Sequence, residues 1–167
     1  MKLLTVTLAA VSLVAISSAD LKSEITLANG MITKAMMKGD MKALESVLRA
    51  SVTSDFKYTE AGRTMNFDQM WTTMKASMSS MKCTMAKATE TMVKEKGKMG
   101  TSVEMNHMMG TMMGADKKQH TMTFDGTSNN TYMKVGKQWK MSKMVVGKSS
   151  MMMDGKPMDM SKMGGGK

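Results

Sequence analysis

The residues in this sequence whose side chains could act together chemically are two histidines and the methionines near them. His107 and His120 are the only histidines, and each is followed two residues later by a methionine, Met109 and Met122. Both pairs lie in segments where apolar and polar residues alternate, which is typical of strands. Imidazole nitrogens and thioether sulfurs bind soft metal ions, and Cu(I) is the ion that suits this combination best.

The way the two strands pair decides whether these four side chains meet. If residues 114–115 form a two-residue turn, His107 faces Met122 and Met109 faces His120 on one apolar face. Cross-strand neighbours of this kind lie about 5 Å apart. The sequence therefore predicts one block of two histidines and two methionines. This block is either a Cu(I) site or the wall of an apolar pocket whose histidines bond to neighbouring groups.

Acid–base chemistry has a weaker basis in the sequence. An isomerase or cyclase needs a buried acid or base, and Asp55 and Tyr58 are the nearest candidates. They lie on opposite faces of one predicted strand, and an aspartate in a hairpin more often bonds to local backbone. No catalytic residue is assigned for this reason. A buried carboxylate without a partner would favour an enzyme, whereas converging histidine and methionine side chains would favour a metal site.

The first part of the chain that must position these residues is helical. Residues 21–38 carry one apolar stripe with a period of 3.6 residues, and a shorter helix follows. Between them, Gly39 suits the left-handed position that ends a helix, and Asp40 suits the N-cap of the next one. A third helix starts near Phe67, because Asn66 and Gln69 have the spacing of a capping box.

Strands are predicted for most of the remaining chain. Val52, Phe56 and Tyr58 favour a strand that turns back at Gly62, ahead of the third helix. Beyond this helix, alternation and turn residues indicate four long strands, over residues 81–94, 99–113, 116–133 and 138–146. Glycine in so long a strand marks a bend, and Gly110 suits this role.

Residues 1–19 predict a secretory signal peptide. A basic start precedes an apolar run over residues 3–16, and Ser17 and Ala19 place small residues ahead of Asp20. We therefore expect cleavage after Ala19 and an exported protein, periplasmic or extracellular. The run is short for a membrane anchor, so no transmembrane segment is expected. Export also makes nucleic acid an unexpected partner, although the formal net charge is +10.

Methionine is the unusual feature of the composition, with 28 residues in the chain. Leu and Ile are scarce after residue 20, so methionine is expected to fill core positions. Cys83 is alone and is expected to be a buried thiol. Residues 20–146 form the predicted domain, and residues 147–167 a flexible tail rich in Met, Gly and Lys. The tail methionines either capture Cu(I), scavenge oxidants or reflect biased composition.

The order of these elements resembles the nuclear transport factor 2-like superfamily, and within it the SnoaL-like exported proteins. The likeness is carried by Ala28-Asn29, by residues 39–44, by residues 55–58 with Gly62, and by the hairpin over residues 132–141. The resemblance implies an α+β cone in which three N-terminal helices pack on a curved, mainly antiparallel sheet. Members include isomerases, cyclases, dehydratases and non-catalytic binding domains, so the fold leaves the function open.

We therefore expect an exported domain that binds a small ligand in a conical pocket. The alternatives are a soft-metal or oxidant-buffering protein that uses Met and His, and a SnoaL-like isomerase or cyclase. A homodimer through the open sheet face is common in the resembled fold. The residues expected to line the pocket are Tyr58, Trp71, Met105, His107, Met109, His120, Met122, Phe124 and Trp139.

Overall fold

The computed structural model describes residues 20–114 and 116–158. The predicted signal peptide lies outside these residues and stays a prediction, as does the export that rests on it. The described chain is an α+β domain. Its elements, in order, are α1 (Leu21–Lys38), α2 (Met41–Ser51), β1 (Val52–Glu60), β2 (Arg63–Met65), α3 (Phe67–Met78), β3 (Met81–Lys96), β4 (Met99–Met113), β5 (Gln119–Val135), β6 (Gln138–Met153) and β7 (Lys156–Pro157).

The helix boundaries follow the predicted capping signals. The carboxylates of Asp20 and Asp40 accept hydrogen bonds from backbone N–H groups in the first turns of α1 and α2. Gly39 has a φ of 66°, the left-handed conformation that ends α1. Asn66 and Gln69 form both bonds of the capping box that starts α3. None of the helices in the described residues combines the length and apolar character of a membrane span.

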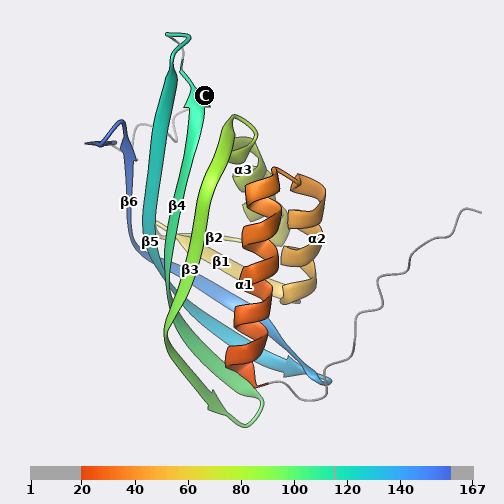
Figure 1. Ribbon diagram of the computed structural model, residues 1–167. Helices are drawn as coiled ribbons and strands as arrows, with labels where there is room; N and C mark the ends of the chain where they lie inside the picture. Colours follow the sequence, from red (N-terminus) through yellow and green to blue (C-terminus); the bar gives the residue numbers. More distant parts are fainter. Residues whose placement is uncertain (1–19, 115, 159–167) are drawn as a thin grey trace, which may run out of the picture.

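The sheet is mixed, with the strand order β2-β1-β6-β5-β4-β3 and β7 paired to the end of β6. Only β1 and β6 are parallel among the described pairs. The long strands β3 to β6 curve strongly, and all three helices of the described chain lie on one side of them (Figure 1). We call the side that faces the helices the inner face and the opposite side the outer face.

Two apolar clusters join the helices to the inner face. The first holds the side chains of α2 and α3 against β1, with Leu44, Phe56 and Trp71 at its centre. The second lies under the start of α1, where Leu21 and Ile25 pack with two aromatic side chains from β5 and β6. A β-carbon at Gly100 would collide with the Leu21 side chain, so glycine is what lets α1 approach β4 this closely.

The predicted register of β4 and β5 is wrong. The connection is a five-residue loop over residues 114–118, closed by a 2.8 Å bond from the Gly114 N–H to the Lys118 carbonyl. Met113 therefore pairs with Gln119, and every direct pair along the two strands joins residues of equal parity. His107 faces Asp125 instead of Met122. The loop length is the physical reason, because a one-residue change in register moves each side chain to the other face.

The predicted tail is wrong for the part of it that the structure describes. β6 continues to Met153, pairs with β5 and turns back into β7. Two bulges in β6 explain why the alternation of apolar and polar residues did not predict its full length. The register shifts opposite Thr131/Tyr132 and again opposite Gly126/Ser128. Each bulge exchanges the residues that face inward, so the alternation changes phase twice along one strand. Residues 159–167, the end of the predicted tail, lie outside the described residues.

Methionine fills the core less than predicted. Met70 and Met122 are the methionines in the fully buried core of the described chain, where Leu, Ile and aromatic side chains predominate. Many others are exposed, and those on the outer face include Met85, Met99 and Met105. The prediction for Cys83 is confirmed, since its thiol is buried. The homodimer expected through the open sheet face stays a prediction.

Candidate functional site

The most unusual group on the inner face is a buried carboxylate. Glu104 lies in the middle of β4, is only 4% exposed, and faces the helices. Its strand neighbours on the same face are Ser102 on one side and Asn106 on the other. Ser128 pairs with Glu104 across β5, and Asn130 pairs with Ser102. The two strands thus bring a row of polar side chains to the centre of the inner face.

One oxygen of this carboxylate accepts three hydrogen bonds. Glu104 Oε1 lies 2.8 Å from Ser102 Oγ, 2.6 Å from Asn130 Nδ2 and 2.9 Å from the Tyr132 hydroxyl. All three donors are more than nine-tenths buried. Burial beside the Glu104 charge also raises the pKa of Tyr132 well above its ordinary range, so the phenol stays a donor.

Helix α1 contributes the remaining donor. Asn29 follows Leu21 and Ile25 at intervals of four residues, so it lies on the helix stripe that faces the sheet. Its amide nitrogen is 3.3 Å from Glu104 Oε2 and 3.0 Å from Glu90 Oε1. Glu90 pairs directly with Glu104 across β3 and β4. A single neutral amide thus bridges two adjacent carboxylates.

The cluster contains acceptors that the described protein atoms leave without partners. No Lys or Arg in residues 20–114 or 116–158 forms an ion pair with Glu104 or Glu90. Ser128 Oγ and Asn130 Oδ1 are buried and lack a hydrogen bond within the same residues. A buried group without a partner costs about 1 to 3 kcal/mol. The site is therefore negative, rich in acceptors, and suited to a donor from outside the chain.

The residues predicted to line the pocket divide between the two faces. Three of them, Met105, His107 and Met109, lie on the outer face. The others lie on the inner side of the sheet or in the core beneath the helices: Tyr58, Trp71, His120, Met122, Phe124 and Trp139. The predicted metal block of His107, Met109, His120 and Met122 therefore does not form one cluster.

His120 instead joins two turns at one end of the sheet. Its Nδ1 is 2.6 Å from Asp154 in the β6–β7 turn, and its Nε2 is 2.9 Å from Asp116 in the β4–β5 loop. Asp154 also accepts the Thr121 N–H at 2.8 Å. The two carboxylates lie at opposite ring nitrogens, so they hold an imidazolium between them and cannot chelate one ion with it.

This clamp gives a pH-dependent prediction. Asp154 and then Asp116 raise the pKa of His120 above its ordinary value of about 6.5, and the imidazole lowers the pKa of both carboxyls. The stabilisation by His120 is full below about pH 6.5 and is lost as pH rises through the raised value. The carboxyl contribution is lost below about pH 4, as pH falls through the lowered values.

Thermal melts of the wild type and His120→Gln should therefore differ most between about pH 4.5 and 6.5. The difference in Tm should shrink toward pH 9. His107→Gln is the matched control, because it removes the other histidine and should leave this pH dependence in place. A difference in Tm that stays constant from pH 5 to 9 would contradict the clamp.

Two shallow hollows are outlined by the described residues, and neither lies between α1 and Glu104. One, of about 250 Å³, is on the outer face around Val103, Asn129 and Val145. The other, of about 340 Å³, lies where α3 meets β3, beside Ser80 and Met112. Glu104 is only 4% exposed and Asn29 of α1 contacts its Oε2, so a ligand would reach this carboxylate only if the side chains over it move.

The sequence predicts that His107 and Met109 face the pocket, which leaves Glu104 on the opposite side of β4. The structure reverses these two faces. Polar alternation over Ser102-x-Glu104 and Ser128-x-Asn130 was a usable signal, as was Asn29 within an apolar helix stripe. The polar alternation was ambiguous, because both faces of these strands carry a mixture of polar and apolar residues.

No family model and no curated protein sequence matches the chain. Solved structures do match in shape. A conserved protein from Planctomyces limnophilus DSM 3776 has a TM-score of 0.61 at 13% identity, over 74% of this chain and 92% of that one. A protein from Novosphingobium aromaticivorans DSM 12444 named after scytalone dehydratase has a TM-score of 0.55 at 8% identity, over 77% and 85%.

A third match carries the fold name itself. An NTF-2 like protein of unknown function from Shewanella oneidensis MR-1 has a TM-score of 0.51 at 14% identity, over 75% of this chain and 97% of that one. At such low identities the likeness concerns the fold alone. The predicted resemblance is confirmed at that level: the chain has the nuclear transport factor 2-like fold.

Proposed function

We propose that this chain binds a small molecule between its helices and the inner face of the sheet, with Glu104 as the central acceptor. The ligand class is a neutral or cationic molecule that carries hydrogen-bond donors, such as an alcohol or an amine. The observation that carries this proposal is the buried Glu104 carboxylate without a cation, beside the unpartnered Ser128 Oγ and Asn130 Oδ1. A ligand that offers hydrogen-bond donors would satisfy these unpaired acceptors.

Entry to this site depends on α1. Gly30 follows Asn29 in the middle of the helix, where glycine costs about 1 kcal/mol relative to alanine. A β-carbon at Gly30 would meet nothing within 4 Å, so packing does not require the glycine. We infer that Gly30 weakens α1 at the point where Asn29 contacts both carboxylates, and that this weakness lets the helix open.

The test combines ligand detection with two matched variants. Native mass spectrometry of the full chain, as purified, detects any molecule that it carries. NMR titration with small alcohols, amides and primary amines then identifies the class that perturbs Asn29, Asn130 and Tyr132. Glu104→Gln should abolish this response. Asp125→Asn, which removes a carboxylate from the outer face, should keep it.

Gly30→Ala tests the entry step separately. It should raise the free energy of unfolding by about 1 kcal/mol and slow ligand exchange. If no compound perturbs the cluster in the wild type, or if Glu104→Gln responds like the wild type, the proposal is wrong.

Proton transfer is a second candidate, favoured by one specific contact. The Glu104 carboxylate and the Tyr132 hydroxyl are 2.9 Å apart and both are deeply buried. A carboxylate base beside a phenol donor suits proton abstraction next to a carbonyl group. The test is deuterium exchange from D₂O into small ketones, followed by NMR. Glu104→Gln should remove the exchange that the wild type catalyses, and equal rates in both proteins would exclude this chemistry.

A further inference from the structure

We propose that the outer face carries a soft-metal site for a monovalent ion of the Cu(I) class, built from the imidazole of His107 and the thioethers of Met85 and Met109. This site is independent of the Glu104 cluster, which lies on the other face of the sheet. It also differs from the site predicted from sequence, because the observed register removes His120 and Met122 from the set.

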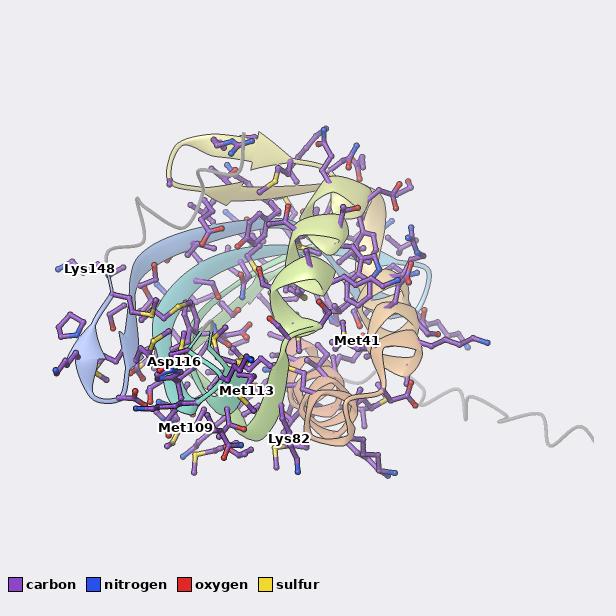
Figure 2. The ribbon with its side chains drawn as sticks, turned by 90° about the horizontal axis from the view of Figure 1, so that it is seen from above. Met41, Lys82, Met109, Met113, Asp116 and Lys148 are labelled. Atoms are coloured by element: carbon purple, nitrogen blue, oxygen red, sulfur yellow. The ribbon has the colours of Figure 1, made fainter. Side chains whose placement is uncertain are left out.

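The strand register brings the three side chains together. Met85 and Met109 are direct partners across β3 and β4, next to a register shift between Cys83 and Met85. In a regular ladder, the β-carbons of such partners lie about 5 Å apart. His107 is two residues from Met109 on the same face, about 7 Å along the strand. Flexible thioether side chains can span such separations. Figure 2 shows Met109 on the side of the sheet away from α2.

A carboxylate fixes the orientation of the imidazole. Asp125 on β5 lies 2.6 Å from His107 Nδ1, so that nitrogen carries the hydrogen of the bond. Within residues 20–114 and 116–158, no hydrogen bond involves His107 Nε2. The side chain is 37% exposed, so an ion in solution can reach it. A histidine held through one nitrogen by a carboxylate is the usual arrangement for binding a metal through the other.

The donor set then selects the ion. Two thioethers and one imidazole are soft, largely neutral ligands, which favour Cu(I) and Ag(I) over Zn²⁺, Mg²⁺ or Ca²⁺. Lys87 on β3 and Asp125 on β5 both pair with His107 and carry opposite charges, so the charges beside the site nearly cancel. The softness of the ligands therefore decides which ion binds.

The test uses Ag⁺, which shares the ligand preference of Cu(I) and does not change oxidation state. The full chain, with ¹³C-methyl methionine, is titrated with AgNO₃ in a chloride-free buffer and followed by NMR. The peaks that disappear in Met85→Leu and Met109→Leu identify the two methyl groups. Both should shift with the first equivalent, and each Leu variant should weaken binding of that equivalent by at least about tenfold.

His107→Gln should weaken binding by a similar factor, and Asp125→Asn by about tenfold, because the carboxylate only orients the ring. Met105→Leu is the matched control. Met105 lies equally far from His107 on the same strand face, but it pairs with Thr89 and Thr127. Its replacement should leave the affinity unchanged.

The replaced side chains are partly or largely exposed, so the variants should keep the melting temperature of the wild type. Three outcomes would overturn the proposal. The first is that the first equivalent of Ag⁺ shifts the methyl signals of other methionines and not those of Met85 and Met109. The second is a loss of affinity in Met105→Leu equal to that in Met109→Leu. The third is an affinity that His107→Gln does not change.

Discussion

Replacing Glu104 by alanine is expected to lower the free energy of unfolding by about 3 kcal/mol and Tm by roughly 10 °C. The carboxylate is the shared acceptor of Ser102, Asn130 and Tyr132. Removing it leaves these buried donors only the longer contacts among themselves, from Asn130 Nδ2 to Ser102 Oγ at 3.2 Å and between Ser102 Oγ and the Tyr132 hydroxyl at 3.3 Å. A buried polar group that loses its partner costs about 1 to 3 kcal/mol. Relief of the desolvation of the charge offsets part of this loss, so the individual costs do not simply add.

Glu104→Gln is the informative companion, measured by the same urea and thermal unfolding. Its amide oxygen still accepts the three bonds at Oε1, so the loss of stability should be about 1 kcal/mol or less. If Glu104→Ala and Glu104→Gln lose the same stability, the charge of the carboxylate stabilises the domain and the shared acceptor does not. If neither variant changes stability, the hydrogen-bond network around Glu104 does not stabilise the domain.

Ending the chain at Val146 should cost at least about 3 kcal/mol, again with a loss of roughly 10 °C in Tm. The truncation removes residues 149–153, which pair with β5 from Gly126 to Met122. It uncovers Met122, which is buried and contributes about 1.5 to 3 kcal/mol by itself. It also removes Asp154, one of the two partners of His120.

A chain ending at Met158 keeps every described residue and serves as the control, with an expected Tm equal to that of the full chain. Circular dichroism melts of the three lengths measure both effects. Equal melting temperatures for the chains ending at Val146 and Met158 would show that the last part of β6 does not stabilise the domain.

Local signals in the sequence were sufficient to predict the helices. Capping residues such as Asp40 and Asn66, and the left-handed Gly39, act within a few residues of the backbone they satisfy. These helix boundaries could therefore be predicted without knowing the tertiary structure, whereas the end of β6 could not. The order of the elements then indicated the fold, which the solved structures of similar shape support.

The candidate site could not be predicted from the same signals. Which face of β4 meets the helices depends on whether the loop before β5 has two residues or five, and that choice is tertiary. Lys117 takes a positive φ of 62° in this loop, a conformation that lysine rarely adopts and that the sequence does not announce. With a two-residue turn, His107 is expected in the pocket, whereas the five-residue loop puts Glu104 on the inner face instead.

The two bulges of β6 allow this strand to gain or lose a residue without turning its later side chains to the opposite face. In a regular strand, a one-residue insertion or deletion moves every later side chain to the opposite face, and selection would remove it. A bulge can absorb such a change by tightening or widening locally. Gly147, beside the second bulge, has no side chain, and this lets Thr127 of β5 pack against its backbone. Because β3 also carries two register shifts, alignment gaps among distant homologues should gather in β3 and β6, next to residues 84, 91, 142 and 147.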